Sequence, residues 1–128
     1  AIAVSGFRNS KAVILQEDFE KNNSKIILCT DDGSEGIHGF VTQPLEDILK
    51  SEKIDMVYSC GPTPMLKNIA AVAKKYNTPC QVSLEERMGC GIGACLVCAC
   101  KIKGENGETE SRHVCKDGPV FNAEEVEW

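Results

Sequence analysis

The sequence predicts an α/β fold with a parallel sheet over residues 1–84, followed by a small β-rich domain over residues 85–128. In the first part, short apolar runs alternate with stretches of helical periodicity, an order typical of strand–helix–strand units. From Glu85 onward, glycine and cysteine dominate, and only short strand-like pieces follow. We therefore expect a domain boundary near residues 84–87, since 128 residues are enough for two small domains.

Four apolar runs of the first domain are expected to be strands. They are residues 2–7, 25–30, 54–59 and 80–84. Three stretches between them have the apolar spacing of a helix, and each follows a residue that can cap one. They are residues 11–21 after Ser10, residues 45–50 after Thr42, and the helix that Thr63 and Pro64 open. The apolar stripe of the third helix is expected to pack in the core and consists of Met65, Leu66, Ile69, Ala73 and Tyr76.

The second domain is expected to contain a hairpin. Its strands would cover residues 98–103 and 109–114, and the segment 103–108 between them has the Gly and Asn content of a turn. Such a hairpin would bring residues 115–119, which form a separate turn, back toward residues 90–98.

Composition excludes several classes of function. The chain has a net charge of −5, and its acidic excess lies mainly in the second domain, which has nine acidic and five basic residues. No basic patch indicates nucleic-acid binding, and no apolar run approaches the length of a membrane span. Eight cysteines without a secretory signal favour a reducing cytoplasm, where thiols bind metals instead of pairing. We therefore expect a cytoplasmic protein.

Four of the eight cysteines have a spacing typical of a metal cluster. Cys90, Cys95 and Cys98 lie in the run GCGIGACLVC, and Cys115 follows in HVCKDGP. The pattern C-x4-C-x2-C…C is that of the ligands of a plant-type [2Fe–2S] cluster, which carries one electron. The sequence therefore predicts an electron carrier that itself needs no catalytic acid, base or nucleophile.

The loop around these cysteines is nearly free of side chains. Gly89, Gly91, Gly93 and Ala94 allow the backbone to curl tightly around a cluster, because glycine accepts a positive φ without steric cost. Backbone N–H groups can then point at the sulfur atoms and tune the reduction potential.

Two other uses of the cysteines stay open at this point. A disulfide framework is the first, although the helix–strand pattern needs no staples. A structural zinc site is the second, although such sites usually have two C-x2-C pairs and this chain has one. We expect Cys29, Cys80 and Cys100 to be packing residues. His38 and His113 are the two histidines that could take part in acid–base chemistry. His113 could be a Rieske-type ligand, but solvent exposure is the preferred interpretation.

Small and polar residues follow the carboxyl ends of the expected strands, where open parallel sheets bind their ligands. They are Ser5, Gly6, Phe7 and Arg8 at the end of the first strand, Thr30, Asp31, Asp32, Gly33 and Ser34 at the end of the second, and Ser59, Cys60, Gly61 and Pro62 at the end of the third. The last three precede a helix N-terminus, whose free N–H groups favour an anionic ligand. Together these strand ends could form half of a nucleotide pocket, or they could be ordinary turn residues. Residues 1–84 lack a G-x-G-x-x-G run after a strand, so a complete dinucleotide fingerprint is missing.

Several segments together resemble the electron-transfer subunit of B-type, NAD-dependent dihydroorotate dehydrogenases, in the ferredoxin reductase superfamily. They are GFRNSKAV, TDDGSEGIHGFVT, YSCGPTPMLK, and EERMGCGIGACLVCACK with HVCKDGPVF. The resemblance covers essentially the whole chain. Its specific part is ERMGCGIGAC and CKDGPVF, whereas CGP is shared by the wider superfamily.

The resemblance implies a partial NAD-binding domain over residues 1–84 and a [2Fe–2S] domain over residues 85–128. Cys90, Cys95, Cys98 and Cys115 would be the cluster ligands, the first two on one iron. The residues on the NAD side would be Gly6, Phe7, Arg8, Thr30, Asp31, Asp32, Cys60, Gly61 and Pro62. Such subunits receive electrons from dihydroorotate through FMN on a catalytic partner subunit. The electrons then pass through the cluster and FAD to NAD⁺ in pyrimidine biosynthesis, and a heterotetramer is expected.

In one respect the chain departs from this family. The flavin-binding barrel and the Gly-rich phosphate loop would lie before Ala1. We therefore expect residues 1–84 to lack the first phosphate-binding unit, and the chain alone to lack FAD, to have an incomplete NAD site and to be inactive. Two alternatives remain, namely a reductase subunit of a sulfide dehydrogenase or hydrogenase complex, and a structural zinc-binding module.

Overall fold

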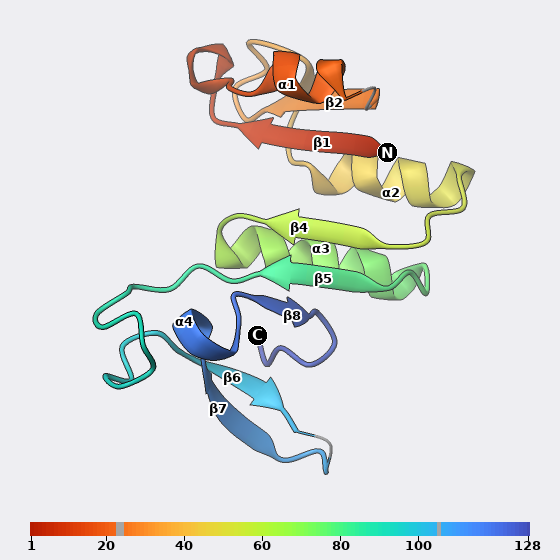
Figure 1. Cartoon of the computed structure of the whole chain (residues 1–128). Coiled ribbons are helices and arrows are strands. Elements are labelled where there is room, and N and C mark those ends of the chain that lie inside the picture. The colour runs from red at the N-terminus through yellow and green to blue at the C-terminus, as the bar shows by residue number, and fades with distance from the viewer. Residues whose placement is uncertain (23–24, 105) are drawn as a thin grey trace. The chain divides into compact units, whose positions relative to one another are not determined.

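The computed structural model describes residues 1–22, 25–104 and 106–128 (Figure 1). The chain divides into two compact units, Ala1–Ser51 and Glu52–Trp128, which are described separately below. Both units combine helices with parallel strands, so the expected α/β architecture with parallel pairing is confirmed. The boundary expected near residues 84–87 stays a prediction. None of the described helices is long and apolar enough to cross a membrane.

The first unit contains a parallel three-stranded sheet in the order β1–β2–β3. Its strands are β1 (Ile2–Phe7), β2 (Lys25–Thr30) and β3 (Ile37–His38). Its helices are the 3₁₀ turn η1 (Ser10–Ala12), α1 (Gln16–Lys21) and α2 (Thr42–Ser51). The bounds of β1 and β2 are those expected from the sequence. The two strands pair from Ile2 opposite Lys25 to Phe7 opposite Thr30, so their carboxyl ends lie side by side.

The helix expected over residues 11–21 is wrong in its first half. The chain forms the short turn η1 and then an extended stretch before α1 begins at Gln16. Val13 and Ile14 are β-branched, which disfavours a helix at this point. The cap is also one residue earlier than expected, because the Asn9 side chain accepts the N–H of Lys11 at 3.1 Å.

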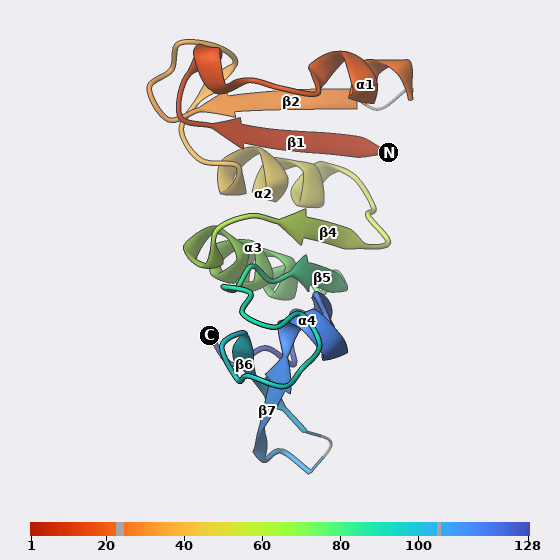
Figure 2. The same cartoon turned by 60° about the vertical axis from the view of Figure 1, so that its left-hand side comes forward.

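The second unit contains one mixed sheet and one hairpin. The sheet consists of β4 (Val57–Cys60), β5 (Cys80–Ser83) and β8 (Val120–Asn122), with β4 parallel and β8 antiparallel to β5. The helix α3 (Thr63–Lys75) contacts β4 and β5 (Figures 1 and 2). The hairpin joins β6 (Ala99–Lys103) and β7 (Thr109–His113), and the short helix α4 (Val114–Asp117) follows directly.

The core of the second unit forms between α3 and the strands. Leu66, Ile69 and Ala73 of α3 are buried, which confirms the packing role of these three positions, whereas Met65 and Tyr76 are half-buried. Val82 of β5 is inaccessible to solvent. The start of α3 differs slightly from the expectation: Thr63 is the first helical residue and Pro62 takes the cap position.

The expected hairpin is confirmed. Its ladder runs from Ala99 opposite His113 to Lys103 opposite Thr109. Within the turn, Gly104 donates to the carbonyl of Glu108 at 2.7 Å. Glu105, which belongs to the expected turn segment, lies outside the described residues.

Candidate functional site

The four cysteines of the expected ligand set come from two places in the second unit. Cys90, Cys95 and Cys98 lie on the irregular loop between β5 and β6, residues 84–98, which we call the cysteine loop. Cys115 lies on α4. The β6–β7 hairpin brings these places together, because the N–H of Val114 donates to the carbonyl of Cys98 at 3.0 Å at the open end of the ladder. The strand register therefore puts the third and fourth cysteines side by side.

The four thiols form two pairs. The side chain of Cys90 is hydrogen-bonded to that of Cys95, and the side chain of Cys98 to that of Cys115. Within the described chain, no three His, Cys, Asp or Glu side chains converge as a site for one metal ion. A tetrahedral zinc site needs four ligands around one point, whereas a two-iron cluster needs two thiolates for each iron. Two pairs of thiols match the two thiolates for each iron that such a cluster needs.

Backbone N–H groups surround the sulfur of Cys90. Those of Ile92 and Ala94 donate to it at 3.4 and 3.2 Å. These two bonds, with a smaller contribution from the side chain of Cys95, lower the pKa of the Cys90 thiol to about 6. The thiolate is the form that binds iron, so the loop favours ligation at this position.

The electrostatics at Cys115 are different. Its hydrogen bond with the Cys98 side chain is the main factor that raises the pKa of the Cys115 thiol. The N–H of Gly93 also bonds to Cys115 and acts in the opposite direction. A bound metal ion deprotonates a coordinating thiol outright, so this pair can still serve as ligands.

Steric constraints explain why several positions of the cysteine loop are glycine. Gly91 and Gly93 have φ values of 71° and 80°, a region that other residues rarely adopt. A Cβ atom at Gly89 would lie 2.8 Å from the sulfur of Cys95. The chain therefore leaves room beside the thiols, as ligation of a cluster requires.

The remaining cysteines do not join this group. All eight thiols are free, and Cys29 and Cys80 are buried in β2 and β5, which confirms their expected packing role. Burial also raises the pKa of both thiols. Cys100 is half-buried on β6, where its thiol contacts the carbonyl of Arg112 at 3.5 Å. Burial raises its pKa as well, which fits a packing role.

The expected exposure of His113 is wrong. Its side chain is only 19% exposed, and its backbone N–H donates to the carboxylate of Asp117 at 2.7 Å. Within the described residues, the buried Nε2 of His113 has no hydrogen-bond partner. The burial follows from register, because His113 is the last residue of β7 and pairs with Ala99 beside the cysteine loop.

Two of the three expected strand-end groups meet in the first unit. The N–H of Asp31 donates to the carbonyl of Phe7 at 3.0 Å, and the N–H of Asp32 donates to that of Arg8 at 3.3 Å. Thr30 is fully buried, and its hydroxyl donates to the carbonyl of Glu35 at 2.6 Å, which closes the loop after β2. Hydrogen bonds from Ser34 lower the pKa of Asp32.

The third group, Cys60 with Gly61 and Pro62, lies in the second unit between β4 and α3. That it shares one pocket with the first two groups stays a prediction. Gly61 has a φ of 150°, and a Cβ there would clash with the end of the Met65 side chain. Gly6 has a packing reason too, because its Cβ would lie 2.6 Å from Cγ1 of Val41. Local packing and backbone conformation therefore already explain why positions 6 and 61 are glycine, without a bound nucleotide.

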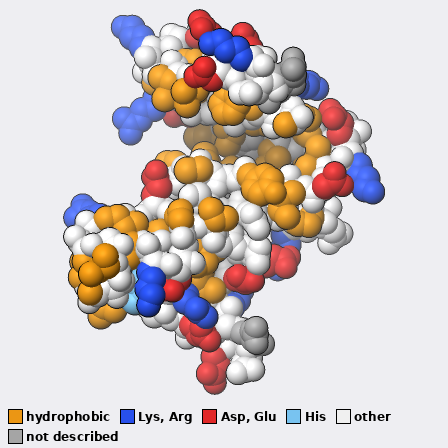
Figure 3. Space-filling view, viewed as in Figure 1, with side chains coloured by type: hydrophobic (Ala, Val, Ile, Leu, Met, Phe, Trp, Pro, Cys, Tyr) orange, Lys and Arg blue, Asp and Glu red, His pale blue; other side chains and the backbone are white. Residues whose placement is uncertain are grey.

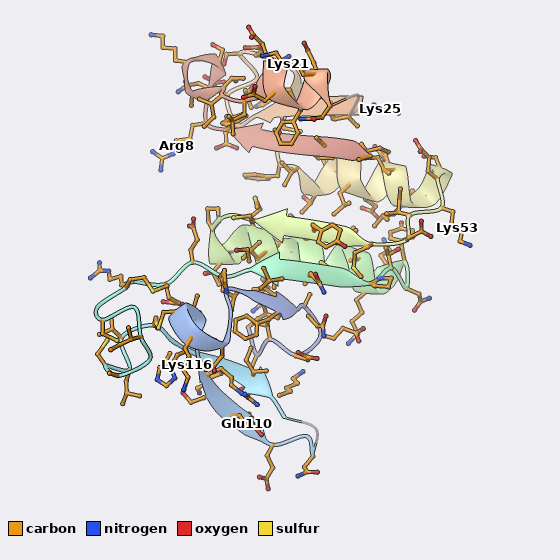
Figure 4. All side chains as sticks on the ribbon, viewed as in Figure 1. Arg8, Lys21, Lys25, Lys53, Glu110 and Lys116 are labelled. Atoms are coloured by element: carbon orange, nitrogen blue, oxygen red, sulfur yellow. The ribbon has the colours of Figure 1, made fainter. Side chains whose placement is uncertain are left out.

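Lys116 was not among the residues expected from the sequence, although it belongs to the cysteine site. It extends from α4, where Figure 4 labels it, and its stem packs on Gly93. The only signal in the sequence is its position directly after Cys115.

Comparison with known proteins identifies the domain that carries this site. Residues 85–127 match the family model described as the iron-sulfur cluster binding domain of dihydroorotate dehydrogenase B. This segment is therefore similar to that domain family. The matched segment contains the cysteine loop, the β6–β7 hairpin, α4 and β8.

Curated relatives extend the similarity beyond the iron–sulfur domain to nearly the whole chain. The electron transfer subunit of dihydroorotate dehydrogenase B (NAD(+)) from Caldanaerobacter subterraneus subsp. tengcongensis is 47% identical over 94% of this chain, which covers 47% of that protein. The subunit of the same name from Bacillus caldolyticus is 45% identical over 98% of this chain and 46% of its own length. The resemblance indicated by the sequence motifs is therefore confirmed. The chain spans a little under half the length of these relatives.

A solved structure supports the fold. An NADH-dependent reduced ferredoxin-NADP oxidoreductase, studied for flavin-based electron bifurcation, matches with a TM-score of 0.80 and 31% identity. The match covers 98% of this chain and 43% of that one. Nearly the whole chain thus has a counterpart of the same fold in that oxidoreductase.

Proposed function

We propose that this chain is the cluster-bearing part of an electron-transfer subunit, in which Cys90, Cys95, Cys98 and Cys115 hold a [2Fe–2S] cluster. The observation that carries the proposal is the arrangement of these four thiols in two pairs around a glycine loop. When bound, the cluster accepts and releases single electrons. The chain's own residues hold the thiols, donate N–H bonds to sulfur and leave space for the group.

An exposed apolar rim beside the cysteine loop supports a relay role. Met88, Ile92, Leu96 and Val97 are between 53% and 75% exposed, and hydrophobic side chains gather over this loop in Figure 3. Exposed apolar groups of this kind mark interaction sites. We assign the rim to docking of the FMN-containing catalytic subunit of dihydroorotate dehydrogenase, within a heterotetramer.

In the proposed path, dihydroorotate reduces FMN on the partner, and the cluster then passes the electrons through FAD to NAD⁺ in pyrimidine biosynthesis. The names of the curated relatives and the reductase-like fold support this path. Residues 1–84 would supply the partial NAD-binding, ferredoxin-reductase-like domain. Its nucleotide-side residues would be Gly6, Phe7, Arg8, Thr30, Asp31, Asp32, Cys60, Gly61 and Pro62.

Purified protein tests the cluster directly. We expect a red-brown protein with about two iron and two sulfide ions per chain and an EPR signal on reduction. We also expect the protein to acquire its cluster when it is produced in the cytoplasm. A colourless protein with one zinc per chain would instead establish the structural zinc module and end the proposal.

The partner is tested separately in a full-length subunit that contains this chain. Mixed with the FMN-containing catalytic subunit, its cluster should be bleached by dihydroorotate and recolour when NAD⁺ is added. A cluster that dihydroorotate cannot reduce in that complex would contradict the assignment. The alternative would then be a reductase subunit of a sulfide dehydrogenase or hydrogenase complex.

Titration of this chain alone with NADH tests the incomplete NAD site. We expect weak binding that does not saturate, because the nucleotide-side residues account for only part of a dinucleotide pocket. Tight and saturable binding would show that residues 1–84 form a complete site.

A further inference from the structure

The turn that carries Cys115 is fastened to the cysteine loop at Gly93. The N–H of Gly93 bonds to the sulfur of Cys115. On the same glycine lies the side chain of the next residue, Lys116. A Cβ at Gly93 would be 2.8 Å from Cδ, 3.3 Å from Cβ and 3.6 Å from Cγ of Lys116. Three carbon atoms of one lysine stem thus cover a single backbone position of the loop.

These contacts matter because the ligand set comes from two separate segments. The cysteine loop supplies three thiols and α4 supplies the fourth, so any movement of α4 away from the loop opens the set. The N–H of Val114 bonds to the carbonyl of Cys98 on one side of Cys115. Lys116 packs on the other side, so the fourth ligand is held from both directions. Lysine suits such a place because its methylene stem can cover apolar surface while its ammonium stays in water.

We propose that Lys116 is a positioning residue for the cluster, whose aliphatic stem holds the Cys115 thiol against the cysteine loop. This inference rests on the proposed function, since it concerns retention of the [2Fe–2S] group. The stem covers Gly93, restricts α4 and slows release of the fourth ligand. The ammonium plays no part in retention.

The charge of Lys116 is the competing explanation and can be separated from the stem. The ammonium helps to lower the pKa of Asp117, so its electric field does reach neighbouring groups. Lys116→Met keeps a stem of similar length and removes the charge, whereas Lys116→Ala removes both. Lys101→Ala, at an exposed lysine of β6 in the same domain, is the matched control for loss of a surface lysine.

The measurement is the rate at which visible absorbance disappears from the loaded protein in the presence of an iron chelator. We expect Lys116→Ala to lose its cluster about three- to tenfold faster than the wild type, because several methylene contacts are lost. Lys116→Met should stay within about twofold of the wild type, as should Lys101→Ala. The EPR spectrum of Lys116→Ala should also change shape, because the Cys115 sulfur moves. Equal rates for Lys116→Ala and the wild type, or equally fast loss in Lys116→Met, would overturn the proposal.

A double-mutant cycle gives a second measurement that does not depend on one variant alone. Gly93→Ala introduces a Cβ that meets the Lys116 stem and also strains a φ of 80°. Part of its effect on cluster loss should therefore disappear in the Lys116→Ala background, and strictly additive effects would contradict the contact. Far-UV circular dichroism of the variants checks that the fold is kept. A wild type without iron would refute the proposed function itself, whereas a loaded wild type with an indifferent Lys116 would refute only this inference.

Discussion

Replacing Gly89 by alanine tests whether the space beside the thiols is needed for the cluster. The backbone of Gly89 has no positive φ, so alanine can adopt it without strain. The new Cβ would, however, lie 2.8 Å from the sulfur of Cys95 and 3.3 Å from Cγ2 of Val97. The substitution therefore acts on the ligand through steric contact and leaves the intrinsic backbone preference of the loop unchanged.

The size of the displacement follows from these distances. The Cys95 sulfur must move by about 0.6 Å to reach ordinary van der Waals contact with the new methyl group. Metal–ligand distances tolerate deviations of only about 0.2 Å. The loop must therefore shift as a whole or release the ligand, and we expect cluster content below about half that of the wild type.

Gly91 provides the matched control. Its φ of 71° means that alanine costs roughly 1–2 kcal/mol in local strain. Nothing lies within 4 Å of the added Cβ, so no sulfur atom has to move. We expect Gly91→Ala to lower the stability of the loop and still to assemble the cluster.

The assay is iron and sulfide per chain, with the EPR spectrum of the reduced protein, for both variants purified in parallel. The steric argument predicts the larger loss for Gly89→Ala. A fully loaded Gly89→Ala protein beside an empty Gly91→Ala protein would refute it, because backbone strain would then outweigh crowding of the sulfur.

Three further outcomes follow from the same geometry. Cys98→Ser should abolish the native EPR signal, whereas Cys100→Ser should keep about two iron atoms per chain, the full content of the cluster. Loss of iron in Cys100→Ser alone would show that Cys100 is the ligand and Cys98 the packing residue. In cluster-free protein, the lowered pKa of Cys90, about 6, means that its thiolate persists down to that pH. The alkylation rate of Cys90, measured by mass spectrometry, should therefore stop rising with pH above about 6. The alkylation rate of Cys115, whose pKa is raised, should still increase above pH 9.0. Leu66→Ala, at a fully buried position, should lower the free energy of unfolding in urea by about 2–5 kcal/mol, and a loss under about 1 kcal/mol would contradict the packing of α3.

The sequence was sufficient to predict the elements with strong periodicity. β1 and β2 have the expected bounds because each is built on a short apolar run, residues 2–4 and 26–29, that has few alternatives. The stripe of α3 was equally predictable from its helical spacing and the proline near its start. The helix over residues 11–21 failed because its apolar spacing is helical while two adjacent β-branched residues oppose a helix there.

The short strands could not be predicted from the sequence, for a different reason. β3 has two residues and β8 has three, so neither is long enough for an alternating pattern to be recognised. Their pairing depends on strands elsewhere in the fold, with β8 joining β5 through Val82 opposite Phe121. Such contacts are long-range and leave no local signal.

The candidate site was predictable in its membership and unpredictable in its arrangement. The spacing of the cysteines selects the four residues, because a short loop must supply three of them. It does not indicate that the N–H groups of Ile92 and Ala94 converge on Cys90, or that Lys116 covers Gly93. Those facts depend on the path of the backbone between the cysteines.

The register of the hairpin explains how sixteen residues can separate the third and fourth cysteines. Ala99 pairs with His113, so Cys98 and Val114, directly outside the ladder, meet at its open end. Adding one residue to each strand would lengthen the hairpin without moving this end. A slip of one residue would turn the side chains to the other face and separate the two ligands. Loop geometry therefore determines the positions of the first three thiols, strand register determines that of the fourth, and the cysteine spacing in the sequence reflects both constraints.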